Sequence, residues 1–143
     1  MRKRILWGIA LLGITVALVA CSSGKYTDVI EVNNQFADAM EEFISAMEKA
    51  DNASTVAGAT NTYAAKIEKI APRVREIADK YPELKDRSKV PEELKKSRKR
   101  DDALGEKLAD TMMKGMMTYR KDPEVRKAQQ RLQKAMMLMM KKK

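Results

Sequence analysis

The sequence predicts an all-α protein, an antiparallel bundle of about four amphipathic helices. Three observations predict this fold class. Large apolar residues recur at alternating intervals of three and four residues, which places them on one face of each helix. Glycine and proline are few, six and four in 143 residues, whereas the good helix formers Ala, Lys, Glu and Met are abundant. No segment shows the strict alternation of apolar and polar residues that is typical of a strand.

Two helices are expected in the first half of the chain, over residues 27–49 and 54–80. A turn separates them, with Asn52 or Ser54 as the candidate N-cap of the second helix. Pro72 removes a backbone hydrogen bond within that helix, so we expect a kink in the turn before it. The second helix has the most regular pattern and should be central to the core. Its apolar stripe consists of Val56, Thr60, Tyr63, Ile67, Ile70, Val74, Ile77 and Tyr81.

Two further helices are expected over residues 91–119 and 123–141. Proline followed by acidic residues opens the third helix, and the Asp-Pro-Glu sequence at 122–124 opens the fourth. The stretch Lys95–Arg100 contains no large apolar residue. It should either project beyond the core or cover a neighbouring helix with its long side-chain stems, and we expect it to be peripheral. Short connections between the helices favour an antiparallel bundle.

Composition removes several classes of chemistry. The chain has 29 Lys and Arg against 20 Asp and Glu, a formal net charge of +9, with one cysteine and no histidine. Without histidine there is no imidazole acid–base catalysis and no Ser-His or Cys-His nucleophile system. The sequence has no glycine-rich phosphate loop and no metal motif. We therefore expect neither a catalytic site nor a small-molecule substrate.

The N-terminus has the pattern of a secretory signal peptide. A cationic start, Met1-Arg2-Lys3-Arg4, precedes an uncharged run over residues 5–20. This run of sixteen residues is short for a permanent membrane span, which needs about 20 apolar residues. A charged start, an apolar stretch and a small residue before a cleavage site together describe an export signal.

The end of this run resembles the lipobox of bacterial lipoproteins. Leu18-Val19-Ala20-Cys21 places a small residue before the cysteine that this family requires. The resemblance covers residues 1–21 and implies cleavage after Ala20, a diacylglycerol on Cys21 and an acyl chain on the new N-terminus. Residues 1–20 would then be the signal peptide, 21–26 the lipidated cysteine and tether, and 27–143 a single helical domain. The helical domain resembles no characterised family that we recognise.

The resemblance also implies a location. Ser22 and Ser23 follow the cysteine, where an inner-membrane retention signal of this family would have aspartate. An organism with two membranes would therefore carry the protein on the outer membrane, facing the periplasm. The leading functional hypothesis is a non-enzymatic, membrane-anchored envelope lipoprotein that serves as a helical scaffold or interaction protein.

Methionine clusters support an alternative hypothesis. Thioethers spaced by three and four residues share a helical face, and two such faces could converge on Cu(I), for which soft ligands are selective. The ordinary role of methionine is to fill irregular cores and to make adaptable contacts. The alternative function is thus a periplasmic Cu(I)-binding protein. Its candidate ligands are Met112, Met113, Met116, Met117, Met136, Met137, Met139 and Met140.

Charge is unevenly distributed along the mature chain. Residues 21–70 carry four Lys and Arg against eight acids, a net charge of −4, whereas residues 71–143 carry 22 against 12, a net charge of +10. An exported protein without an aromatic platform is not expected to bind nucleic acid. The expected partners are the membrane, through the lipid anchor, and an anionic envelope polymer or a protein. The ordinary alternative is a solvated basic face that is partly neutralised by the acidic first helix.

Overall fold

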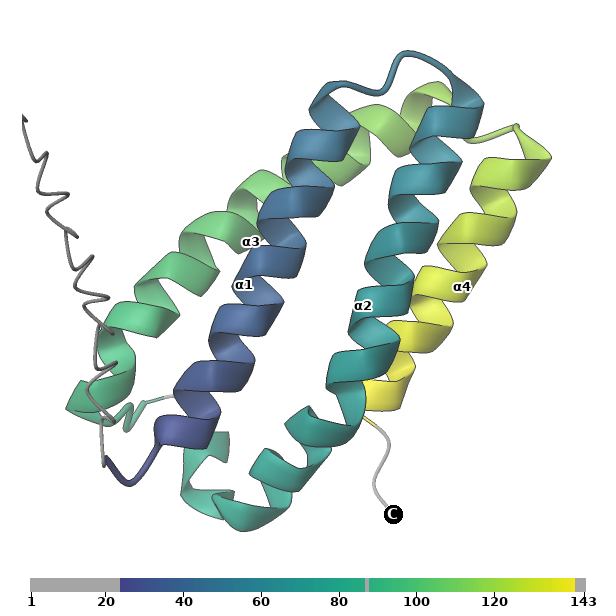
Figure 1. Cartoon of the computed structure of the whole chain (residues 1–143). Helices are drawn as coiled ribbons and strands as arrows, with labels where there is room; N and C mark the ends of the chain where they lie inside the picture. Colours follow the sequence, from purple (N-terminus) through teal and green to yellow (C-terminus); the bar gives the residue numbers. More distant parts are fainter. Residues whose placement is uncertain (1–23, 87, 141–143) are drawn as a thin grey trace, which may run out of the picture.

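The computed structural model describes residues 24–86 and 88–140, which form four α-helices and one short 3-10 helix (Figure 1). The described residues contain no strand, so the all-α prediction is confirmed. Each α-helix begins and ends within one residue of the expected position. The helices are α1 Thr27–Glu48, α2 Ala53–Lys80, α3 Glu92–Thr118 and α4 Pro123–Met140, with η1 Pro82–Lys85 in the connection after α2.

Local sequence explains where α2 begins and where it bends. The Asn52 side chain accepts a hydrogen bond from the backbone N–H of Thr55 at 2.9 Å, and the Asn52 backbone N–H donates to Thr55 Oγ1 at 3.2 Å. This reciprocal capping box identifies Asn52, not Ser54, as the cap. Pro72 lies inside the helix, and Figure 1 shows the last turns of α2 changing direction toward the start of α1. The expected kink is therefore present.

Successive helices run in opposite directions, but they are not all packing neighbours. Helix α1 packs against α2 and α3, and α2 packs against α1 and α4, whereas α3 and α4 have few direct contacts. The pairs α1–α3 and α2–α4 are parallel (Figure 1). The expectation that short turns place neighbouring helices side by side thus holds for α1 and α2 only. These two helices form the centre, and α3 and α4 cover them.

All four helices contribute to one hydrophobic core. Val56, Tyr63 and Ile67 of α2 are among its most completely buried side chains, and Ile70 lies beside them. Helix α4 contributes four buried residues to this core, whereas Leu94 and Leu108 are the buried residues of α3. The prediction that α2 is central is confirmed, because it supplies the largest buried residues and packs on two long helices. A smaller cluster of Tyr26, Val29, Tyr81 and Leu94 closes the end of the bundle where α1 begins.

Tyr63 introduces an unpaired polar group into this core. Its ring stacks on Phe43, with the ring centroids 4.8 Å apart, and burial raises the pKa of its hydroxyl to about 12. No described residue forms a hydrogen bond with that hydroxyl. Removing an unsatisfied buried polar group is neutral or stabilising, so Tyr63→Phe should raise the free energy of unfolding by up to about 1 kcal/mol. Urea unfolding followed by circular dichroism measures the change, and a marked loss of stability would contradict the prediction.

Candidate functional site

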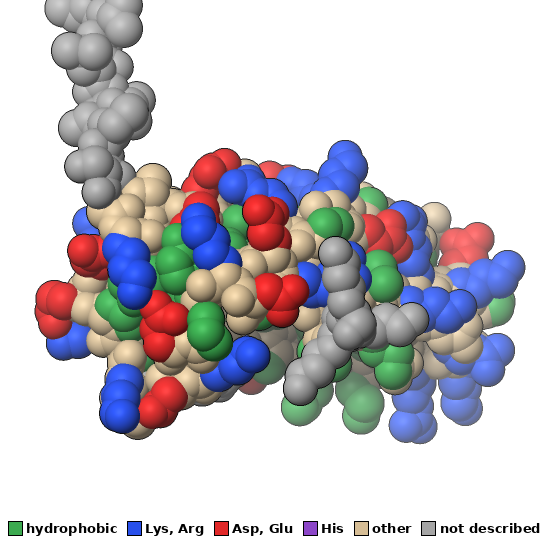
Figure 2. Space-filling model, turned by 90° about the horizontal axis from the view of Figure 1, so that it is seen from below, with side chains coloured by type: hydrophobic (Ala, Val, Ile, Leu, Met, Phe, Trp, Pro, Cys, Tyr) green, Lys and Arg blue, Asp and Glu red, His purple; other side chains and the backbone are tan. Residues whose placement is uncertain are grey.

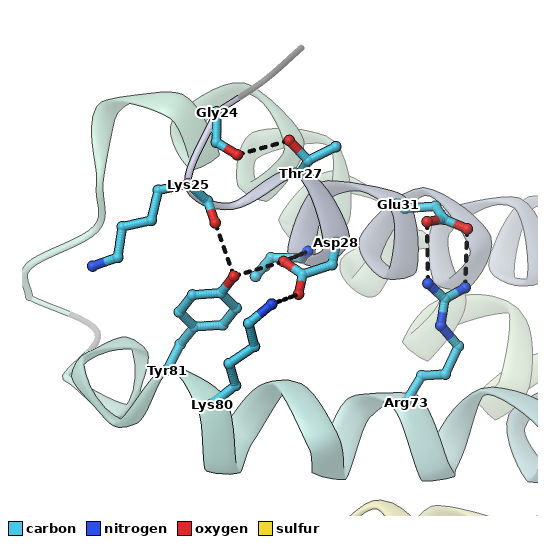
Figure 3. A network of polar contacts seen from close by, with 9 residues as sticks. Gly24, Lys25, Thr27, Asp28, Glu31, Arg73, Lys80 and Tyr81 are labelled. Carbon is cyan, nitrogen blue, oxygen red and sulfur yellow. Dashed lines mark hydrogen bonds and ion pairs between the residues drawn. The ribbon is translucent and has the colours of Figure 1, made fainter. Parts of the chain in front are cut away.

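The end of the bundle where α1 begins is fastened by a network of polar contacts (Figure 3). The Tyr81 hydroxyl, just after α2, lies 2.8 Å from the carbonyl oxygen of Lys25 and 3.0 Å from Asp28 Oδ1. Its single hydrogen can donate to one of them at a time. Lys80 Nζ contacts the other carboxylate oxygen of Asp28 at 2.7 Å. We call Lys25, Asp28, Lys80 and Tyr81 the anchor-end clamp.

Two further ion pairs adjoin the clamp, one between α1 and α2 and one between Lys25 and η1. Arg73 binds the Glu31 carboxylate in a bidentate manner, at 3.0 and 3.1 Å, and Lys25 Nζ contacts Glu83 at 2.8 Å. Arg73 lowers the pKa of Glu31, and Lys80 lowers the pKa of Asp28. The Arg73–Glu31 and Lys25–Glu83 pairs are largely exposed, so each contributes little to the free energy of unfolding. The Lys25–Glu83 pair joins the residues before α1 to η1.

The basic stretch Lys95–Arg100 is attached to acidic α1 through part of its length. Arg100 contacts Asp38 and Glu41 at 2.9 Å each, and Asn33 donates to Ser97 at 3.0 Å. Lys95, Lys96 and Lys99 are exposed. The stretch was expected either to project beyond the core or to cover a neighbouring helix. Arg100 and Ser97 cover α1. The stretch is peripheral to the hydrophobic core, as expected, but it positions α3 on α1.

A cleft of about 380 Å³ lies next to the anchor-end clamp, between α1, the end of α2, η1 and the start of α3. Its lining includes the cations Lys85, Lys89 and Arg98 and the carboxylates Asp86, Asp101 and Asp102. Burial raises the pKa of Asp101 to about 6, Arg100 opposes this rise, and Asp102 adds to it. Periodicity did not single out Asp101, because its environment is made by three other segments. The apolar residues that line the cleft include Val29, Ile77, Tyr81, Leu84, Val90 and Leu94.

The raised pKa of Asp101 predicts a pH-dependent stability effect. Between about pH 4 and 6 the folded protein binds this proton more tightly than the unfolded chain, so stability falls as pH rises through that window. Asp101→Asn removes the penalty. The variant should match the parent near pH 4 and exceed its stability at pH 8 by about 1 kcal/mol, after allowance for partial exposure. Thermal unfolding at both pH values measures this difference. Asp102→Asn is the matched control, and equal effects of the two substitutions would contradict the assignment.

Each methionine cluster is divided between core and surface. Met112, Met116, Met136 and Met139 pack against the main hydrophobic core. Met113, Met117, Met137 and Met140 are exposed. Half of the thioethers therefore have the ordinary role of core filling, and the other half form apolar surface.

The two clusters lie at opposite ends of the bundle. The α3 cluster surrounds Gly115, where an added Cβ would overlap the side-chain end of Met47, near the end of α1. The α4 cluster occupies the last turns of α4, at the end where α1 begins (Figure 1). With a rise of 1.5 Å per residue the clusters are separated by about 20 Å along the bundle. One Cu(I) ion in one copy of this fold could therefore use one cluster, but not both.

Cys21, the predicted site of lipid attachment, and Ala20, after which cleavage is predicted, lie outside the described residues. Within residues 24–86 and 88–140, no group of acidic side chains is arranged to hold a metal ion. In the same part of the chain, none of the helices has the length and apolarity of a transmembrane span. The apolar pattern does not predict the clamp. Tyr81 ends the apolar stripe of α2, but its hydroxyl contacts Lys25 and Asp28, which are more than 50 residues away in the sequence.

Comparison with protein-family models, with curated proteins and with solved structures finds no match for this chain.

Proposed function

We propose that this chain is a lipid-anchored, non-enzymatic protein of the bacterial cell envelope, whose helical bundle serves as a scaffold or interaction module. The observation that carries the proposal is the sequence Leu18-Val19-Ala20-Cys21 at the end of an uncharged run. In this proposal, cleavage after Ala20 leaves Cys21 as the first residue. A diacylglycerol on its sulfur and an acyl chain on its nitrogen then hold the protein at the membrane.

The spacing between Cys21 and the bundle supports a short attachment. Ser22 and Ser23 separate Cys21 from Gly24, the first described residue. Three residue steps span at most about 10 Å, so the anchor-end clamp would lie close to the bilayer surface. The clamp ties the start of α1 to the end of α2, and the lipid would therefore hold the whole bundle by one end.

The proposed location and partners follow from the same residues. Ser22 after the lipidated cysteine favours the outer membrane, facing the periplasm, in an organism with two membranes. The partner classes are an anionic envelope polymer or a protein. Arg100 and Arg131 are ion-paired with acids of α1 and α2, and Lys95 and Lys107 also have acidic partners. Exposed lysines such as Lys96, Lys99 and Lys134 are therefore the cations available to such a partner.

Mass spectrometry of the protein isolated from its native membrane tests the proposal. The expected N-terminal peptide lacks residues 1–20 and carries the mass of a diacylglycerol and an acyl chain on Cys21. An unmodified cysteine in the membrane-bound protein would overturn it. The Cu(I) hypothesis stays a separate prediction: titration of the soluble chain under reducing conditions should give saturable binding if one methionine cluster forms a site.

A further inference from the structure

We propose that the C-terminal end of α4 is a second membrane contact, which lies on an anionic phospholipid bilayer beside the lipid anchor. The inference rests on the proposed function, because the anchor determines which end of the bundle faces the membrane. Figure 1 shows the start of α1 and the end of α4 at the same end of the molecule. A lipid within about 10 Å of Gly24 therefore brings the last turns of α4 to the bilayer as well.

The last turns of α4 expose large apolar side chains at this end. Met137 is 55% exposed, Leu138 38% and Met140 76%. Figure 2 views the molecule from this end and shows hydrophobic side chains projecting at its lower edge. Thioether and leucine side chains in this position lose contact with water when they enter the boundary between headgroups and acyl chains.

The charge of the same segment is of one sign. Residues 132–143 contain four lysines and no acid. Lys134 lies exposed one turn before Leu138, and the other three, at 141–143, lie outside the described residues. At the same end, Lys25 contacts Glu83 and Lys80 contacts Asp28, so these two cations are neutralised locally. A basic, apolar helix end is the composition of a segment that binds an anionic bilayer surface. One lipid group combined with a basic patch is also a known means of stable anchoring.

The apolar surface at the opposite end provides an internal comparison. Met113 and Met117 are as exposed as the α4 methionines, at 67% and 61%, but they lie near the end of α3, away from the start of α1. A lipid at Cys21 would hold them far from the bilayer. Membrane contact should therefore depend on the exposed side chains of α4 and not on Met113 and Met117, although both surfaces expose methionine.

Vesicle sedimentation of the chain 22–143, which has no lipid, tests the surface on its own. Both hydrophobic clusters lie within residues 26–135, so this chain keeps the whole bundle. It should bind vesicles of phosphatidylcholine with phosphatidylglycerol, not vesicles of phosphatidylcholine alone, and added salt should weaken the binding. The triple variant Met137→Gln, Leu138→Gln, Met140→Gln should lower partitioning at least about tenfold, equivalent to about 1.4 kcal/mol.

The double variant Met113→Gln, Met117→Gln is the matched control and should bind as the parent does. Circular dichroism verifies that both variants keep their helices. Three results would overturn the proposal: no binding to anionic vesicles, equal loss in the control, or self-association that the triple variant abolishes without any vesicle binding. The last would identify a second copy of the chain as the occupant. Mass spectrometry tests the lipidation of Cys21 separately. An unlipidated Cys21 would contradict the proposed anchor, whereas vesicle sedimentation alone decides whether the end of α4 binds a bilayer.

Discussion

Replacing Ile67 by alanine should destabilise the protein more than any surface substitution, by about 2–5 kcal/mol. Ile67 is 0% exposed and lies in the part of α2 that faces α1 and α4. Alanine removes three carbon atoms from a filled core, and the cost combines lost burial with the cavity that remains. In a domain whose stability is of the order of 5–10 kcal/mol, this change should lower Tm by about 10 °C or more.

Thermal unfolding of matched variants measures the difference. Ile70→Ala, in the same stripe, should have a comparable but smaller effect, because this side chain keeps some exposure. Lys69→Ala on the outer face of α2 and Lys96→Ala on α3 remove exposed charged side chains and should change stability by no more than about 0.5 kcal/mol. A Tm loss at Lys96 as large as that at Ile67 would mean that the buried faces are assigned incorrectly.

Cys21→Ser should release the protein from the membrane or leave it as an uncleaved precursor. Serine offers no thiol for the thioether, and each acyl methylene that is lost removes about 0.8 kcal/mol of membrane affinity. With two or three chains absent, the remaining contact at the end of α4 would be weak and salt-sensitive. Fractionation of cells into membrane and soluble material, with and without high salt, measures the shift.

Ser22→Ala is the control for this substitution, because it changes the neighbouring residue and keeps the thiol. Purified Cys21→Ser protein should show the same helical circular dichroism as the parent, since both hydrophobic clusters are built from residues 26–135. Membrane retention through high salt of a serine variant that has lost residues 1–20 would show that Cys21 does not anchor the chain.

Helix positions could be predicted from the sequence, because the signals that set them are local. The 3/4 spacing of apolar residues defines the α2 stripe, Asn52 starts the helix through a bond three residues away, and Pro82 stops it. These interactions act within one or two turns, so they can be recognised without knowledge of any other segment. The burial of Ile67 and Ile70 followed from the same pattern.

The arrangement of those helices was decided only in the tertiary structure. Periodicity shows that a helix has an apolar face but not which other face will cover it. Helix α3 packs on α1 and has few contacts with α4, and Arg100 contacts Asp38 and Glu41 across 59 or more residues of chain. The separation of the two methionine clusters and the burial of Asp101 in the cleft follow from that packing, since each depends on contacts between segments far apart in the sequence.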